Sequence, residues 1–329
     1  MCTAAAYNCK GLFFGRTLDS DVSYGEEAVI TPSGFPFSFR RVSRAQSLPR
    51  GGIRHAIVGA AAVVEGYPLY FDGMNDAGLC MAGLNFKGNA RYNAPQNGKI
   101  NLAQYELLPY LLGKCESVAE AGEELAQINI TPDAFSAAQS PAELHWLIAG
   151  KGGCIAAECT EGGMKVYDNA AGVLTNNPPF DCQMSNLANY MSLSAARPAN
   201  NFGDYGAEEY GAGLGAFGLP GDYSPMSRFV RAAFVRANIR CGDGEADGVL
   251  ALFDILNSVR VPRGCCRSEG GDFYTQYSCC CSAESKTYYF THGACRTPFA
   301  VSLNTPKAAG EELVRFSMGA PVPVNKLNF

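Results

Sequence analysis

The chain lacks the features of a nucleic-acid-binding or membrane-spanning protein. Lysine and arginine form no runs along its 329 residues, and its formal net charge is −5. A nucleic-acid interface would require a basic patch. The longest apolar stretch, Ala56 to Val64, is too short to cross a bilayer. We therefore expect neither nucleic acid nor a membrane as a partner.

Export and zinc signals are also missing. The N-terminus, MCTAAAYNCKGLFFGR, has no cationic start followed by an apolar run and a cleavage site, which predicts a cytoplasmic protein. Its fourteen cysteines include no C-x-x-C pair, and Cys265–Cys266 and Cys279–Cys281 have the wrong spacing for tetrahedral zinc. His292 and Cys295 alone are a weak metal signal. We expect most cysteines to be free thiols, either small buried hydrophobes or inert surface groups.

The composition, 47% hydrophobic and 17% charged, is that of a globular protein. Short apolar or β-branched runs between Gly, Pro, Asn or Asp predict strands. These runs are Thr3–Tyr7, Leu12–Leu18, Ala28–Thr31, Ile57–Val64, Leu79–Leu84, Leu144–Ile148, Cys154–Glu158, Met164–Tyr167, Val173–Thr175, Tyr274–Ser282, Thr287–Thr291 and Phe299–Leu303.

Helices are predicted between these blocks of strands. Asn101 is expected to cap a helix whose apolar residues recur at helical spacing, and the capping box Ser117 to Glu120 opens a second. Others are expected near Asp181–Leu193, from Ser224-Pro225 onward and over about Ala246–Val259, with an irregular, Gly-rich loop at Arg197–Asp222 after the first of these three. With no repeat or linker, this order predicts layered sheets covered by helices in one domain, residues 1–329.

Cys2 is the first candidate for chemistry. A small residue in second position permits removal of Met1, which would give Cys2 a free α-amine. A thiol with a pKa near ~8.5 would then lie beside an amine with a pKa of ~7.7–8.0, and the amine can take the thiol proton without a histidine. A cysteine at this position can also be an accident, and position taken alone favours that interpretation.

Arg16 and Asp19 lie where a hairpin would bring them back to Cys2. If Thr3–Tyr7 and Leu12–Leu18 pair around a turn at Asn8–Gly11, Arg16 can stabilise a thiolate and Asp19 can hold the α-amine. A surface ion pair of little energetic value is the ordinary alternative.

Several motifs, taken in order, are specific although each is weak alone. They are M-C-T at the start, F-G-R-T-L-D at Phe14–Asp19, S-Y at Ser23–Tyr24, F-D-G-M-N at Phe71–Asn75, A-G-L-N-F at Ala82–Phe86, L-H-W at Leu144–Trp146, G-V-L-T-N at Gly172–Asn176, G-L-P-G-D at Gly218–Asp222 and S-R-F at Ser227–Phe229. In these motifs the sequence resembles the choloylglycine hydrolase family, from residue 1 to about residue 290.

The resemblance implies an α+β fold, the four-layer αββα sandwich of N-terminal nucleophile hydrolases. It also implies a catalytic set made of Cys2 as nucleophile, Arg16 and Asp19 beside it, Asn85 and Asn176 near the oxyanion, and Arg228 as second arginine. Read alone, Asn85 and Asn176 are more often turn formers. Arg228 opposes the dipole at the start of its helix, which a functional role would explain.

The function implied by the resemblance is hydrolysis of the amide bond of glycine- or taurine-conjugated bile acids, without a metal or organic cofactor. Penicillin V acylase and N-acyl homoserine lactone acylase are alternatives, as is an inactive binding protein on the same fold. Leu18, Tyr24 and Phe35 are expected to flank a sterol-sized pocket, unless they are core residues. Thr17 and Leu18 depart from many relatives, and we expect neither to touch the reaction centre. The family also implies a homotetramer.

Overall fold

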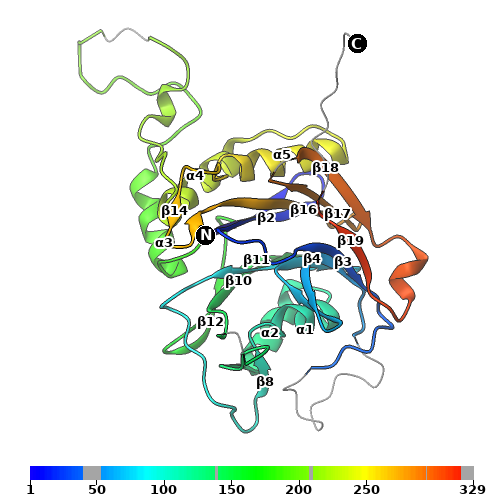
Figure 1. Ribbon diagram of the computed structural model, residues 1–329. Helices are drawn as coiled ribbons and strands as arrows, with labels where there is room; N and C mark the ends of the chain where they lie inside the picture. Colours follow the sequence, from blue (N-terminus) through cyan, green and yellow to red (C-terminus); the bar gives the residue numbers. More distant parts are fainter. Residues whose placement is uncertain (40–52, 138–139, 207–209, 294, 320–329) are drawn as a thin grey trace, which may run out of the picture.

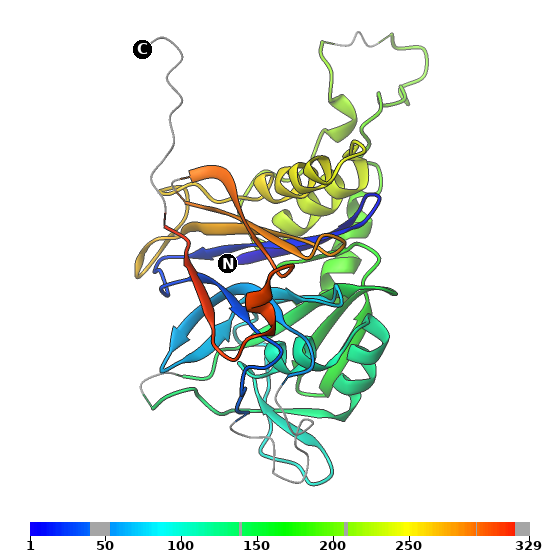
Figure 2. The same ribbon diagram turned by 90° about the vertical axis from the view of Figure 1, so that its right-hand side faces the viewer.

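The computed structural model describes residues 1–39, 53–137, 140–206, 210–293 and 295–319. Two antiparallel sheets lie face to face, and helices cover the outer face of each, so the predicted αββα sandwich is confirmed (Figures 1 and 2). The six-stranded sheet has the order β13-β1-β2-β16-β17-β18. Its strands are β1 (Cys2–Asn8), β2 (Leu12–Ser20), β13 (Val173–Leu174), β16 (Tyr274–Ser282), β17 (Thr287–His292) and β18 (Cys295–Ser302).

The nine-stranded sheet has the order β12-β11-β10-β7-β6-β4-β3-β19, with β5 paired to β4. Its strands are β3 (Glu27–Thr31), β4 (Ile57–Val64), β5 (Tyr67–Tyr70), β6 (Asp72–Asn75), β7 (Cys80–Asn85), β10 (Leu144–Gly150), β11 (Gly153–Thr160), β12 (Gly163–Asp168) and β19 (Val314–Ser317). Two small sheets pair β8 (Ile100–Ala103) with β9 (Ile128–Thr131), and β14 (Arg267–Ser268) with β15 (Gly271–Asp272).

The helices form the two outer layers (Figure 1). The layer over the six-stranded sheet contains α3 (Phe180–Leu187), α4 (Pro225–Asn238) and α5 (Glu245–Asn257), and the layer over the nine-stranded sheet contains α1 (Leu107–Lys114) and α2 (Val118–Gln127). Short 3₁₀ turns occupy Ala188–Tyr190, Leu214–Ala216 and Pro306–Ala309. No helix among these described residues is long and apolar enough to cross a membrane.

β1 is buried on both faces, which explains its run of small side chains. Its residues Thr3 to Ala6 are at most 3% exposed, with helices α4 and α5 on one side and the second sheet on the other. The helix layer lies very close: a Cβ on Gly248 of α5 would be 2.1 Å from the ring of Phe13. Small residues in β1 and α5 therefore let the layers approach around the N-terminus.

Two local predictions need correction and one holds. Asn101 caps no helix: it lies in β8, where its Oδ1 accepts from Asn129 Nδ2 at 2.8 Å, and α1 begins six residues later at Leu107. Ser117 does cap α2, accepting from the amide of Glu120. Glu120, however, accepts from the amide of Glu116 at 3.0 Å and thus does not close a capping box with Ser117.

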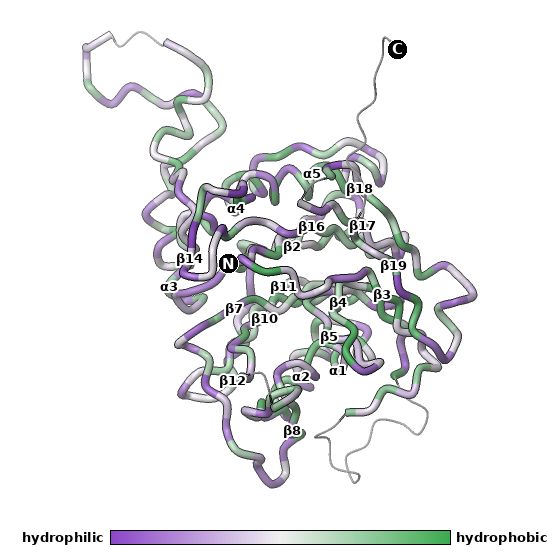
Figure 3. Tube along the Cα trace, in the orientation of Figure 1, coloured by the Kyte–Doolittle hydropathy of each residue, from purple (hydrophilic) through white to green (hydrophobic). Residues whose placement is uncertain are grey.

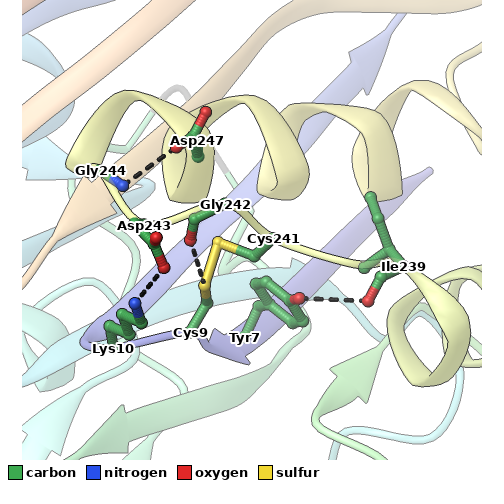
Figure 4. Close-up of a disulfide and its surroundings, with 9 residues drawn as sticks. All are labelled: Tyr7, Cys9, Lys10, Ile239, Cys241, Gly242, Asp243, Gly244 and Asp247. Atoms are coloured by element: carbon green, nitrogen blue, oxygen red, sulfur yellow. Dashed lines mark hydrogen bonds and ion pairs between the residues drawn. A yellow bond between two sulfur atoms is a disulfide. The ribbon is translucent and has the colours of Figure 1, made fainter.

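The thiol prediction holds with one exception. Twelve of the cysteines are free, but Cys9 and Cys241 form a disulfide across 232 residues (Figure 4). The turn between β1 and β2 carries Cys9, and the segment after α4 carries Cys241, so the bond ties the N-terminal hairpin to the helix layer. Two cysteines so far apart in the sequence give no local signal of pairing.

Candidate active site

The β1–β2 hairpin determines which side chains surround Cys2. The predicted pairing is confirmed, with Cys2 opposite Leu18 and Ala4 opposite Arg16. Because side chains alternate along a strand, Cys2, Leu18 and Arg16 share the face toward the second sheet, and Asp19 lies on the opposite face.

Arg16 is buried at the interface between the sheets. It is 1% exposed, and its Nη1 donates to the carbonyl oxygens of Gly83 at 2.7 Å and Phe71 at 3.1 Å. Its Nη2 is buried without a hydrogen-bond partner among the described residues. Burial would lower the pKa of Arg16, but acidic neighbours, with Cys2 first among them, raise it above its ordinary value. Arg16 is therefore a buried cation whose unoccupied donor can serve a thiolate or a substrate oxygen.

Asp19 is buried too, and two hydroxyl groups hold its carboxylate. Thr275 donates to Oδ1 at 2.6 Å and Thr17 donates to Oδ2 at 3.3 Å. Thr17 also accepts from the amide of Thr3 at 3.2 Å. The expectation that Thr17 stays away from the reaction centre is therefore wrong, because it joins the nucleophile strand to Asp19.

The N-terminal amine lies inside this site. In the full chain the amine of Met1 donates to the backbone oxygen of Asp19 at 3.0 Å. Burial lowers the pKa of this amine, against the raising effect of the acidic groups of Cys2 and Asp19. Burial at this place therefore favours the neutral form of the Met1 amine.

Asn176 connects the elements that meet at Cys2. Its Oδ1 accepts from the nitrogen of Cys2 at 2.8 Å and from Arg228 Nη2 at 2.7 Å. Its Nδ2 donates to the backbone oxygen of Asn85 at 2.7 Å. Asn176 follows β13, which pairs with β1, so the six-stranded sheet itself carries this side chain to the nucleophile.

Arg228 lies behind Cys2 and is fully buried. Its Nη1 donates to the carbonyl oxygen of Cys2 at 2.5 Å and to Thr3 Oγ1 at 2.6 Å, and its Nε donates to the Tyr223 oxygen at 2.9 Å. Ser224 caps α4 as predicted, which places Arg228 in the first turn of the helix. Burial lowers the pKa of Arg228. Its contacts with β1 give a structural reason for a cation that opposes the helix dipole.

Asn85 ends β7 of the second sheet and is exposed to the cavity beside Cys2. Its Oδ1 accepts from the amide of Lys87 at 3.0 Å. That contact fixes the side chain through its oxygen, and Nδ2 is the only donor of the amide group.

A cavity of about 660 Å³ opens at the nucleophile. Met1, Cys2, Arg16, Leu18, Asp19, Tyr24 and Asn85 line it, together with apolar side chains that include Leu69, Phe71, Leu108, Phe135, Leu144, Trp146 and Phe273. Leu18 and Tyr24 thus lie where they were predicted. Phe35 does not: it packs against Phe37 in the core below the nine-stranded sheet.

Sequence reasoning missed the threonine hydroxyl groups that hold the charged residues in place. Thr275 lies opposite Asp19 across β16 and β2, and Thr3 receives Arg228. Only the long-range pairing of β2 with β16 could have identified Thr275. Among the described residues, no group of three or more His, Cys, Asp or Glu side chains could hold a metal ion.

Comparison with known proteins agrees with this geometry. Residues 2–316 match the linear amide C–N hydrolases of the choloylglycine hydrolase family, so the similarity extends beyond residue 290. A bile salt hydrolase/transferase of Lactiplantibacillus plantarum is 41% identical over 320 residues, 97% of each chain.

Two solved structures resemble the fold. A variant of conjugated bile acid hydrolase from Clostridium perfringens has a TM-score of 0.89 at 31% identity, covering 99% of this chain and 100% of that one. Penicillin V acylase from Agrobacterium tumefaciens has a TM-score of 0.76 at 20% identity, covering 97% and 92%, and shares the fold alone.

Proposed function

Because the chain belongs to the choloylglycine hydrolase family of linear amide C–N hydrolases, we propose that it hydrolyses bile acids conjugated to glycine or taurine. The L. plantarum relative, named for bile salts, supports this substrate class. The observation that carries the proposal is the cavity of about 660 Å³ that ends on Cys2. Its volume lies within the ~300–1,000 Å³ of small-molecule sites, and its wall is mostly apolar side chains, which suits a steroid body.

The proposed mechanism starts with removal of Met1, which frees the nitrogen of Cys2 as an α-amine. This amine takes the thiol proton, and the thiolate sulfur attacks the amide carbonyl carbon. The C–N bond then breaks, the amine passes its proton to the departing glycine or taurine nitrogen, and a thioester remains on Cys2. Water cleaves the thioester and releases the bile acid.

The other site residues support charge and position in this proposal. Arg16, with its unoccupied Nη2, stabilises the thiolate or an anionic substrate oxygen. Asn176 holds the nitrogen of Cys2 at 2.8 Å, and Arg228 holds the carbonyl of the same residue. Asp19 offsets the positive charge of Arg228. Asn85 Nδ2 donates to the oxyanion of the tetrahedral intermediate, a contact whose loss typically costs ~10²–10³ in kcat.

Acyl transfer is a second candidate, because the name of the L. plantarum relative includes a transferase. The thioester on Cys2 can be resolved by an amine in place of water: the amine nitrogen attacks the carbonyl carbon, the C–S bond breaks, and the α-amine carries the proton from that nitrogen to the departing sulfur. Incubation of cholate-loaded enzyme with excess free glycine or another amino acid would reveal new conjugates by mass spectrometry.

The main test is parallel kinetics on glycocholate, taurocholate and penicillin V. We expect kcat/KM for a conjugated bile salt to exceed that for penicillin V by at least about tenfold. Discrimination of this size is typical of a difference in the fit of two substrates to one pocket. Asn85→Tyr should narrow this ratio by about 10–200-fold, because a ring would fill the cavity beside Cys2. A clear preference of the unaltered enzyme for penicillin V would overturn the proposed bile acid substrate, while the proposed chemistry of Cys2 would still hold.

Intact mass tests the mechanism separately. Active protein should begin at Cys2, since an amide nitrogen cannot act as the base. Full activity in a preparation that retains Met1 throughout would contradict the proposed role of the α-amine. A cytoplasmic location and a homotetramer remain predictions, and the projecting arm described below supports the second.

A further inference from the structure

A histidine–glutamate pair is buried behind the site. His145 of β10 lies opposite Glu158 of β11, and both side chains are 0% exposed. The ring nitrogen Nδ1 of His145 lies 2.9 Å from Glu158 Oε1. Side chains alternate along β10, so the neighbours Leu144 and Trp146 line the substrate cavity and His145 points away from it.

Both nitrogens of the His145 ring face acceptors. Nδ1 faces the carboxylate of Glu158, and Nε2 lies 3.0 Å from the carbonyl oxygen of Thr175, which can only accept. The Thr175 carbonyl therefore requires an N–H on Nε2. The ring also stacks on Phe86, with centroids 4.3 Å apart and planes 8° from parallel. The stacking therefore fixes the plane of the His145 ring, and the two hydrogen bonds fix how the ring is turned within that plane.

The pair holds both ends of one short segment. His145 holds the carbonyl of Thr175, and both oxygens of Glu158 accept from the amide of Phe180, at 3.1 and 3.2 Å. Between them Gln183, itself fully buried, donates to the carbonyl oxygens of Asn176 at 3.3 Å and Asn177 at 3.2 Å. The segment that carries Asn176 thus has its backbone fastened at four places.

We propose that His145 and Glu158 are positioning residues that hold Asn176 against the nitrogen of Cys2. The inference rests on the proposed function, since it assigns them an effect on the same amide hydrolysis. Neither residue touches the cavity, so neither should contribute to substrate binding. A shift of about 1 Å in a catalytic group can cost ~10²-fold in rate, so a fastening of this kind acts on kcat.

The test compares two variants that differ only at position 145, where one keeps the histidine and the other carries a phenylalanine. In Glu158→Gln, the new amide can donate to Nδ1 and still accept from Phe180, so a neutral His145 keeps its N–H on Thr175. We expect kcat within about threefold of the unaltered enzyme, well below a tenfold loss. In Glu158→Gln with His145→Phe, the ring still fills the space against Phe86 but the donor to Thr175 is lost. We expect kcat to fall at least about tenfold with KM changed less than about twofold.

A second pair in the chain gives a matched control. His55 Nδ1 lies 2.6 Å from Asp76 Oδ1, outside the cavity residues. The double variant His55→Phe with Asp76→Leu should lose stability but keep kcat. In the double variant Glu158→Gln with His145→Phe, the glutamine side-chain amide loses its partner on the ring. If this loss prevents folding, the variant His145→Phe with Glu158→Leu, which has no such buried amide, replaces it in the test.

The outcomes separate the two proposals. Unaltered enzyme that does not hydrolyse conjugated bile salts overturns the proposed function, whatever the variants do. Active enzyme whose His145→Phe, Glu158→Gln variant keeps kcat within twofold of Glu158→Gln alone overturns the positioning role. A loss of kcat that the His55 and Asp76 control matches would have the same consequence, because general destabilisation would then explain it.

Discussion

The charged residues around Cys2 are buried, and each depends on fixed neutral dipoles. Arg16, Asp19 and Arg228 are 1%, 3% and 0% exposed. Carbonyl groups accept hydrogen bonds from the two arginines, and threonine hydroxyl groups donate hydrogen bonds to the aspartate. Buried charges are costly unless hydrogen bonds compensate them, so these backbone and hydroxyl contacts are part of the site. Donors and acceptors fixed in this way need little rearrangement when charge develops during the reaction.

The geometry of the site predicts which cysteine reacts first. Cys2 lines the cavity of about 660 Å³, so a small reagent can reach its sulfur, and two buried arginines interact with it. Burial instead raises the pKa of most other thiols: well above the ordinary value for Cys279 to Cys281, and to about 12 for Cys115 and Cys154. We expect brief iodoacetamide treatment at neutral pH to alkylate Cys2 fastest, with activity lost in step.

The competitors in this experiment are surface thiols, and they define its control. Cys182 and Cys265 are exposed and Cys266 is partly so. A variant with all three changed to Ser should keep its activity and lose it at the unaltered rate on alkylation. Peptide mapping that finds Cys265 labelled while activity persists and Cys2 stays unmodified would contradict the expected order.

Among single residues of the site, the sequence pattern could predict those that one hairpin brings together and few of the others. The positions of Arg16 and Asp19 beside Cys2 follow from a seven-residue strand, a tight turn and the register of β1 and β2. Asn85, Asn176 and Arg228 come from other strands and a helix, and only the family motifs identified them. Thr275 arrives through pairing of β2 with β16 and had no signal of either kind.

Single elements show where periodicity is ambiguous. Leu102 belongs to β8 and Leu108 and Leu111 belong to α1, yet all three are buried in the same core. Because the turn at residues 104–106 is short and leucines on both sides of it enter one core, the apolar spacing resembles one helix beginning at Asn101. Ser224-Pro225 and Ser117 were predicted correctly as helix starts, since capping depends on neighbouring residues alone.

The disulfide provides a prediction at the scale of elements. Cys9 and Cys241 join the β1–β2 turn to the segment after α4, where other links include a Tyr7 hydroxyl bond to Ile239 at 3.3 Å and an exposed ion pair between Lys10 and Asp243 (Figure 4). The bond closes a loop of 232 residues. Changing both cysteines to Ser should lower the free energy of unfolding by about 2–4 kcal/mol. Denaturant unfolding of oxidised protein would measure this.

Reductant supplies the matched comparison for the disulfide. Reduction should shift the unfolding midpoint of unaltered protein to that of the double Ser variant, and leave the variant unchanged. If reductant changes neither protein, the two cysteines are free thiols in solution. A change of Cys182 to Ser controls for loss of an exposed thiol, and it should leave the midpoint in place.

At the scale of the whole molecule, layering could be predicted but connectivity could not. Blocks of strands and paired helices indicate sheets covered by helices, and the two sheets and two helix layers agree. The order β13-β1-β2-β16-β17-β18 places N-terminal strands beside C-terminal ones, and no local pattern encodes such pairing. The C-terminal strand β19 joins the edge of the other sheet beside β3.

One part of the molecule lies outside these layers. The described parts of the predicted irregular segment Arg197–Asp222, residues 197–206 and 210–222, leave the body beside α3 and α4 as an arm that projects away from it (Figures 1 and 2). Hydrophobic stretches alternate with hydrophilic ones along it (Figure 3). Its aromatic residues are largely exposed: Phe202 by 83%, Tyr205 by 70%, Tyr210 by 84% and Phe217 by 82%. Exposed apolar side chains gathered in this way are typical of a surface that another protein covers.

The last prediction follows from this arm and concerns assembly. The arm narrows where the amide of Ser194 donates to the Gly215 oxygen at 2.9 Å, so residues 198–212 can be replaced by two glycines without opening the body. If the arm reaches a neighbouring subunit, unaltered protein should have about four times the chain mass of 35.0 kDa in light scattering, and the shortened variant should have a lower mass.

A second variant tests the aromatic side chains of the arm. Changing Phe202, Tyr205 and Tyr210 to Ser should also lower the mass, since fully burying one large apolar side chain contributes about 1.5–3 kcal/mol. Leu250→Ser, on exposed α5 surface, is the control and should leave the mass unchanged. Tetramers that persist in both arm variants would assign the arm a role other than assembly.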